Sequence, residues 1–465
     1  MSTNKSIARS AGIIGLATSL SRLLGLIRDM VIAGFFGTAI YAQAFVVAFR
    51  IPNLLRDLVG EGAMNAAFVP VLTEELTKKG RVAFFKLAQV VLNILCVALI
   101  VLTIIGIWAS PTIARLIAPG FVADTEKFKI TITLTRILFP FLMLVGLWAY
   151  TMGLLNTLSH FAAPAFGPCI LNLSMILCAM WFGENVFGLT TGVLVGGVLQ
   201  LLVQFPPLYL RGWKARLTAE FKHPKAKRIG ILLIPRALAS CVYQINLFIS
   251  TILASLPIAG DGTVAALYFA NRVWQLPLAI FGIALAQAAL PTMSRQVALN
   301  DMQNLKNTLL FSLRTLFFIL LPSTIGLMVL HIPITRLLFE HGRFNIYSTQ
   351  ITSNALFFYA VGLIACGGIK MLVNVFYSLQ DTLTPVKVAM MSVVVNIILN
   401  LLLIARLKAG GLALATSLAA IFNCILLYFL LRGRIGSLGV RQISGSLLKI
   451  SLAAWLWGSY VIMLH

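Results

Sequence analysis

Residues 21–70 read SRLLGLIRDMVIAGFFGTAIYAQAFVVAFRIPNLLRDLVGEGAMNAAFVP, and they decide how the rest of the chain is interpreted. The segment is apolar enough to lie in a lipid bilayer, yet it contains four arginines: Arg22, Arg28, Arg50 and Arg56. Arginine keeps its charge in proteins and is costly in hydrocarbon, so at membrane depth it normally faces a bundle interior or a watery cavity. The segment therefore predicts membrane-spanning helices that line a polar path.

The charges of this segment follow one spacing twice, in Arg22, Arg28 and Asp29 and again in Arg50, Arg56 and Asp57. Each aspartate comes seven residues after the first arginine of its group, and a step of seven returns to nearly the same face of a helix. Each aspartate can therefore partly neutralise one arginine. The predicted site stays net positive.

Composition excludes an ordinary soluble protein. Of 465 residues, 60% are hydrophobic and only 11% are charged, whereas about a quarter of residues are charged in soluble domains. Apolar runs of roughly 20 residues, the length that crosses a bilayer as a helix, predict an all-α polytopic membrane protein. The predicted spans are 11–36, 39–72, 84–109, 131–156, 162–183, 186–210, 229–257, 263–293, 308–331, 349–377, 384–405, 410–431 and 446–464.

The net charge of +23 is interpreted as loop charge rather than as a sign of nucleic-acid binding. Basic residues gather on the connections of one side of the predicted membrane, and by the positive-inside rule this side, with the N-terminus, is cytoplasmic. Lys5 and Arg9 precede an apolar run, but Arg22 and Arg28 interrupt it, which disfavours a signal peptide. The chain is therefore expected to cross a membrane several times from a cytoplasmic N-terminus.

Catalytic and metal-binding patterns are not found in the sequence. It has no GxxxxGK[ST], GxSxG or HExxH motif, and its six cysteines show no CxxC spacing. We therefore expect neither an enzyme nor a cofactor or metal site.

An internal repeat organises the predicted spans. Three pairs of positions in similar motifs are each 221 residues apart: Pro70 and Pro291, Leu158 and Leu379, and Pro164 and Pro385. This offset contains six spans, so both halves have the same orientation and are related by an axis along the membrane normal, with the substrate site between them. The predicted domains are a six-helix lobe at 1–221, a second at 222–442 and an additional transmembrane helix at 443–465.

The repeat places Arg272, 222 residues after Arg50, in the second helix of the second lobe. Guanidinium groups bind phosphate through bidentate, charge-assisted hydrogen bonds, so the expected guest is a phosphate or pyrophosphate. The alternative is that these arginines reach to the interface or hold helix pairs through Asp29 and Asp57. Only Asp29, Asp57 and Glu61 are acids within spans, which disfavours a cationic substrate.

Helix-breaking residues occur at matching places in the two halves. Pro52 and the sequence Gly60-Glu61-Gly62 correspond to Pro277 and Gly282. Such residues allow a membrane helix to bend. Discontinuous helices that permit rocking of the lobes are predicted here.

Five motifs carry a resemblance to a known family: SRLLGLIRD, FRIPNLLRDLVGEGAMNAAFVP, APGF at 118–121, NTLSHFAAPAF and YFANRVWQLP. Over residues 7–435 the chain resembles the MurJ (MviN) family of lipid II flippases, within the multidrug/oligosaccharidyl-lipid/polysaccharide exporter superfamily. The resemblance implies export of undecaprenyl-pyrophosphate-linked peptidoglycan precursor, lipid II, from the cytoplasmic to the periplasmic leaflet by alternating access. Its implied partners are lipid II, membrane lipids and cell-wall synthesis proteins.

The resemblance also assigns site residues. The family's cavity arginines match Arg22, Arg28, Arg56 and Arg272, and the motif positions Ser21, Asn53 and Glu61 would support them. Three departures stand out: Gln43 replaces a common acid, the relatives' sodium site is matched only by Asn396, Asn400 and Thr416, and one helix rather than two is expected after the repeats.

Two alternatives stay open. One is a flippase for another polyprenyl-pyrophosphate-linked oligosaccharide, which would use the same arginines. The other is a membrane scaffold whose arginines only organise partner proteins. The ion or potential that drives transport is left open as well.

Overall fold

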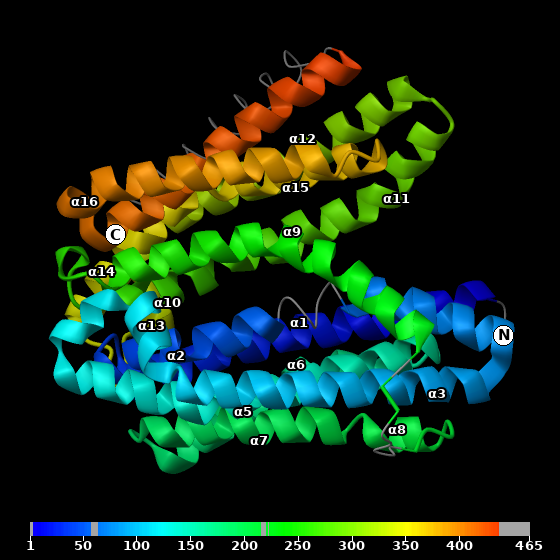
Figure 1. The fold of residues 1–465 in the computed structure, drawn as a ribbon. Helices are drawn as coiled ribbons and strands as arrows, with labels where there is room; N and C mark the ends of the chain where they lie inside the picture. The colour runs from blue at the N-terminus through cyan, green and yellow to red at the C-terminus, as the bar shows by residue number, and fades with distance from the viewer. Residues whose placement is uncertain (1–2, 57–63, 215–219, 222, 437–465) are drawn as a thin grey trace. The chain divides into compact units, whose positions relative to one another are not determined.

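The computed structural model describes residues 3–56, 64–214, 220–221 and 223–436, and nearly all of these residues are helical (Figure 1). The predicted all-α fold is confirmed for this part of the chain. Contacts divide the chain into two compact units, Met1–Gln244 and Ile245–His465. The boundary between the units falls inside helix α9 (Pro224–Ser255).

Within the described residues, seven helices are long and apolar enough to cross a membrane, or up to eight if the bent pair α14 (Ile346–Val361) and α15 (Leu363–Ser378) is one span. Some predicted spans share one long helix. The predicted spans 384–405 and 410–431 are the two arms of α16 (Leu383–Ile435), which turns at Lys408. The predicted span 446–464 lies outside the described residues.

Unit 1 is built around α5, which packs against α2, α3 and α7, while α6 packs against α1 and α7. In its core, Tyr150 of α5 is fully buried beside Phe68 and donates a hydrogen bond to the carbonyl oxygen of Ala88 at 2.7 Å. This bond satisfies a hydroxyl that burial would otherwise penalise. The elements are α1 (Thr3–Phe36), α2 (Ile40–Arg56), α3 (Met64–Trp108), α4 (Ser110–Ile117), η2 (Pro119–Ala123), α5 (Thr125–Thr157), α6 (Ala162–Phe182), α7 (Val186–Leu202) and α8 (Phe205–Tyr209).

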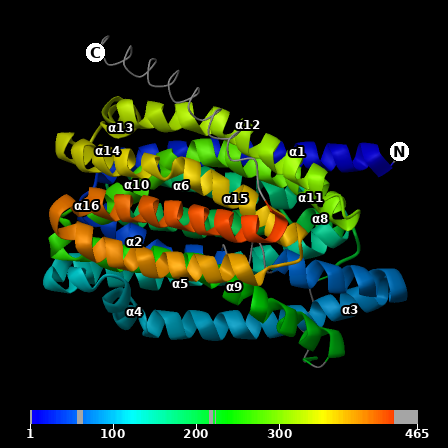
Figure 2. The same ribbon diagram turned by 90° about the horizontal axis from the view of Figure 1, so that it is seen from above.

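Unit 2 is arranged around α14, α15 and α16, and α15 and α16 lie side by side in both views (Figures 1 and 2). The discontinuity predicted near Pro277 and Gly282 is present as a π-helical segment, η4 (Leu278–Ile283). The remaining elements are η3 (Pro257–Ala259), α10 (Thr263–Pro277), α11 (Ala284–Ala298), α12 (Met302–Val329) and α13 (His331–Phe339).

The 221-residue repeat is visible in the secondary structure of the two units. The starts of α4 and α13, of α5 and α14, and of α6 and α16 are each 221 residues apart. Ser159 and Gln380, also 221 apart, both have positive φ, at 56° and 59°, a conformation uncommon outside glycine. Asp124 and Asn345 cap α5 and α14 at matching positions. The motif repeat therefore reflects repeated local structure.

Ion pairs fasten the start of α9 to α3 within unit 1. Lys225 lies 2.6 Å from a carboxylate oxygen of Glu75 and 3.3 Å from one of Glu74, and Arg228 lies 3.3 Å from Glu74. These contacts explain why the first part of α9 belongs to unit 1. The lobe boundary at 221–222, drawn from the motif repeat, stays a prediction.

Gly362, at the bend between α14 and α15, leaves no room for a side chain. An added Cβ would lie 2.8 Å from both the Cα and the Oγ of Ser417 in α16. Gly362→Ala is expected to destabilise the protein by about 1–3 kcal/mol, as overpacking does. Gly433→Ala is the control, because nothing lies within 4 Å of its added Cβ. Thermal unfolding in detergent, followed by tryptophan fluorescence, checks this; equal unfolding temperatures for both variants would contradict it.

Candidate functional site

Arg28 is buried between α1 and α6, with only 5% of its surface exposed. Its Nε and Nη2 donate to Oδ1 of Asp29 at 3.0 and 2.7 Å, and its Nη1 donates to Oδ1 of Asn172 in α6 at 2.9 Å. Asp29 is fully buried. A buried charge is tolerated when it is paired and hydrogen-bonded, and this arrangement provides both.

Asn172 joins this network to a second point on α1. Its Nδ2 donates to the carbonyl oxygen of Ser21 at 3.0 Å and lies 3.5 Å from the Ser21 hydroxyl. One amide therefore accepts from Arg28 and donates to Ser21, two turns earlier on the same helix. Sequence reasoning did not identify Asn172. Its only signal was an amide inside the apolar run 162–182.

Arg22 has a different environment from Arg28. Its side chain is exposed, and among the residues that the structure describes it makes no ion pair. Asp29 was expected on the face of Arg22; it pairs instead with its neighbour Arg28. Arg28 is thus paired with a carboxylate, while the side chain of Arg22 is exposed.

The arginines of α2 are only partly described. Arg50 and Asn53 are half-buried. Arg56 ends α2, and nothing further is described of its side chain. Asp57 and Glu61 lie outside the described residues, so their predicted contribution stays a prediction.

Gln43, at the position where relatives are expected to carry an acid, has a local structural role. It is 2% exposed, and its Nε2 donates to the carbonyl oxygen of Thr38 at 3.1 Å. The amide therefore ties α2 to the turn before it. It brings no ionisable group to this place.

In unit 2, Arg272 lies half-buried on α10 against the ring of Tyr268, one turn earlier. Its guanidinium carbon is 5.0 Å from the ring centroid, and Nη2 donates to the Tyr268 hydroxyl at 3.3 Å. Stacking on an aromatic face stabilises a guanidinium while its in-plane donors point along its edge. Tyr268 is a second residue that the sequence did not single out.

The residues matched to an ion site form a neutral network between the two arms of α16. Asn400 Nδ2 donates to Asn396 Oδ1 at 2.7 Å, and Asn396 Nδ2 lies 3.5 Å from Thr416 Oγ1. Both asparagines are fully buried. Within the described residues, no group of three or more His, Cys, Asp or Glu side chains could hold a metal ion. The network joins the arms, and an ion there stays a prediction.

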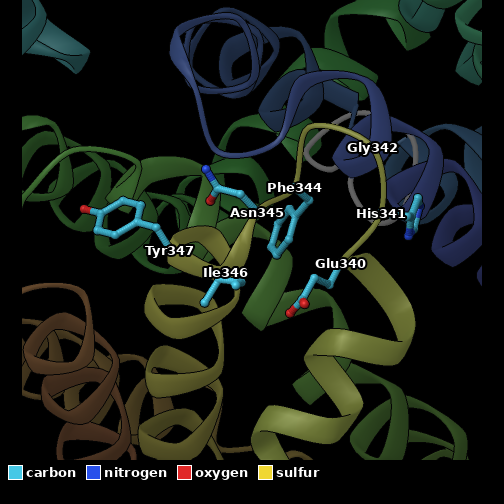
Figure 3. A pocket seen from close by; sticks show the side chains of 7 residues that line it. All are labelled: Glu340, His341, Gly342, Phe344, Asn345, Ile346 and Tyr347. Carbon is cyan, nitrogen blue, oxygen red and sulfur yellow. The ribbon is translucent and has the colours of Figure 1, made fainter.

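A cavity of about 510 Å³ lies in unit 2 at the connection between α13 and α14 (Figure 3). Two polar residues of its lining, Glu340 and Asn345, bond to residues of α13 and α14. Glu340 accepts from Thr349 at 2.6 Å and from Arg336 at 3.2 Å, and these bonds lower the pKa of the Glu340 carboxyl. Asn345 Oδ1 caps α14 by accepting from the Ser348 backbone N–H. These bonds give Glu340 and Asn345 partners within the protein.

Comparisons with known proteins agree on one family. The family model described as lipid II flippase MurJ matches residues 32–465. The chain is 36% identical to the lipid II flippase MurJ of Burkholderia cenocepacia over 90% of this chain and 82% of that one, and 36% identical to a probable lipid II flippase MurJ of Vibrio cholerae over 92% and 83%.

A solved structure titled lipid II flippase MurJ, inward closed conformation, is similar with a TM-score of 0.83 and 29% identity, over 97% of this chain and 92% of that one. An inward-facing transporter of the MATE family shares the fold with a TM-score of 0.74 at 15% identity, over 90% and 95%.

The network around Arg28 predicts the effect of removing Asp29. Asp29→Ala leaves a buried guanidinium without its carboxylate, a change that costs about 3–5 kcal/mol. Arg22→Ala, at an exposed arginine of the same helix, should stay within about 0.5 kcal/mol of wild type. Thermal unfolding in detergent compares the two. The interpretation is wrong if Asp29→Ala unfolds no earlier than Arg22→Ala.

Proposed function

This chain belongs to the MurJ family of lipid II flippases, and we propose that its arginines bind the pyrophosphate of lipid II while the lipid crosses the membrane. It is a transporter rather than an enzyme, and it acts in peptidoglycan biosynthesis. Its substrate carries a polyprenyl tail, a pyrophosphate and a disaccharide-pentapeptide. Of these parts, the pyrophosphate is the one that cationic side chains recognise.

The observation that carries this proposal is the contrast between Arg22 and Arg28 on α1. Arg28 is neutralised and held by Asp29 and Asn172, whereas Arg22 is exposed and lacks an ion pair within the described part of the chain. A pyrophosphate bound near Arg22 would meet a guanidinium whose charge is not already compensated. Such charge-assisted bonds are about twice as strong as neutral ones.

The other predicted residues complete the proposed site. Arg272, stacked on Tyr268, would bind from the second lobe, and Arg50 and Arg56 would bind from α2. Ser21, Asn53 and Glu61 would orient these cations, with Asp57 as a partner for Arg50. Bending at η4, just after Pro277, would let the lobes rock during alternating access.

The proposed location is the bacterial inner membrane, with the N-terminus in the cytoplasm. The support is the gathering of basic residues on one side of the predicted spans. Membrane lipids and cell-wall synthesis proteins are the proposed partners besides lipid II.

Complementation tests the function directly. A bacterium depleted of its own lipid II flippase should grow with the wild-type chain but not with Arg22→Ala or Arg272→Ala. Arg22→Lys should restore growth at most partly, because lysine supplies charge without bidentate geometry. Arg432→Ala, at an exposed arginine of α16, is the control and should restore growth. Membrane levels of each variant are measured by immunoblot.

The outcomes separate the alternatives. Growth restored equally by all variants would favour a scaffold over a transporter. A wild-type chain that inserts normally but restores no growth would point to another polyprenyl-pyrophosphate-linked oligosaccharide.

Orientation is tested with single cysteines in a cysteine-free variant. Ile346→Cys should react in intact spheroplasts with a maleimide that cannot cross the membrane, because its exposed side chain lies in a predicted periplasmic connection. Lys214→Cys should react only after permeabilisation. The reverse pattern would contradict a cytoplasmic N-terminus.

A further inference from the structure

A second cavity, of about 570 Å³, lies in unit 1 where the α5–α6 turn meets the end of α7 and the short helix α8. Its lining residues include none of the arginines of α1 and α2. They are His160, Ala162, Ala163, Phe166, Val203, Pro206, Pro207, Leu210 and Arg211. Its volume lies within the range of ligand sites, roughly 300–1,000 Å³.

Most of this lining is apolar and incompletely covered by protein. Val203 is 41% exposed and Leu210 is 82% exposed, while Phe166 is half-buried. Contact of this apolar surface with water is unfavourable. A lipid acyl chain that packs against it at the ends of the membrane helices would remove it from water.

The rim of the cavity is cationic. Arg211 Nη2 lies 3.2 Å from Nδ1 of His160, and Arg211 Nη1 donates to the carbonyl oxygen of Pro207 at 3.0 Å. Burial, together with the charge of Arg211, lowers the pKa of His160. A neutral imidazole can accept the bond at Nδ1, so both partners of the guanidinium are uncharged.

The positive charge of Arg211 is therefore uncompensated at this site. No carboxylate lines the cavity among the described residues, and Arg211 forms no ion pair within that part of the chain. Basic pockets between membrane helices at the cytoplasmic side suit the head groups of anionic lipids.

We propose that this cavity binds an anionic phospholipid, with its phosphate on Arg211 and one acyl chain along Phe166, Val203 and Leu210. The phosphate then pairs with the guanidinium of Arg211, and the acyl chain covers the apolar side chains of the lining. The site is a lipid site additional to the one that binds the transported substrate. Only the assignment of its leaflet as cytoplasmic rests on the proposed topology.

The test measures lipid binding to the purified full chain in detergent. Phosphatidylglycerol is compared with phosphatidylcholine of identical acyl chains and with glycerol phosphate, and binding is followed by the rise in unfolding temperature and by native mass spectrometry. Phosphatidylglycerol should bind and stabilise, phosphatidylcholine should bind more weakly, and glycerol phosphate should have no effect at the same concentration.

Variants separate this site from general attraction to a chain of net charge +23. Arg211→Gln should weaken phosphatidylglycerol binding about fivefold, the change that corresponds to about 1 kcal/mol per basic residue near a membrane surface. Arg432→Gln removes an exposed arginine from α16 in unit 2 and should leave the dissociation constant within twofold.

Leu210→Asn is a second variant, which shows whether weaker lipid binding can occur without the structural effect of replacing Arg211. Its side chain is mostly exposed, so the lipid-free protein should unfold at the wild-type temperature while phosphatidylglycerol binding weakens. The proposal is overturned if Arg211→Gln and Leu210→Asn both bind phosphatidylglycerol like wild type. Equal binding of phosphatidylcholine, or binding of glycerol phosphate alone, would also overturn it.

Discussion

The buried ion pair between Arg28 and Asp29, completed by Asn172, is the constraint on which the first unit depends. Taking two charges out of water costs several kcal/mol per ion, and the cost is offset only when geometry and hydrogen bonds are good. Here three guanidinium bonds of 2.7–3.0 Å reach two residues. Because Asn172 also binds Ser21, a sliding of α1 along α6 would break bonds at two levels.

This constraint gives the arginines of one chain different tasks. Arg28 is charged but compensated, so it holds helices together. Arg22 is exposed, and Arg272 is supported by the face and hydroxyl of Tyr268. In the proposed function, an anionic substrate would pair with Arg22, which makes no ion pair within the described part of the chain. The pyrophosphate of lipid II is the proposed source of this negative charge.

The internal repeat preserves helix starts, caps and turns in both units, but it does not preserve the charges of Arg28 and Asp29. The caps of α5 and α14, the turns at Ser159 and Gln380, and the starts of three pairs of helices keep one offset. At that same offset, Arg28 and Asp29 correspond to Ile249 and Ser250, which are uncharged. Both units need the same helix ends and turns in order to pack, whereas the buried ion pair stabilises only the contact between α1 and α6. The two units therefore share an architecture but differ in their buried charges.

The sequence by itself determined the properties that depend on local composition and spacing. Hydropathy predicts helices in a membrane, matching prolines predict the repeat, and the motifs around Arg22, Arg28, Arg56 and Arg272 indicate the family.

Only the tertiary structure decided which charges are compensated. Arg28 meets Asn172, 144 residues away, because α1 docks on α6 with a particular rotation, and Arg211 meets His160 across 51 residues because α8 folds back beside the α5–α6 turn. Spacing along a helix tells which residues share a face. The partner of that face depends on helix packing, which no local pattern in the sequence encodes.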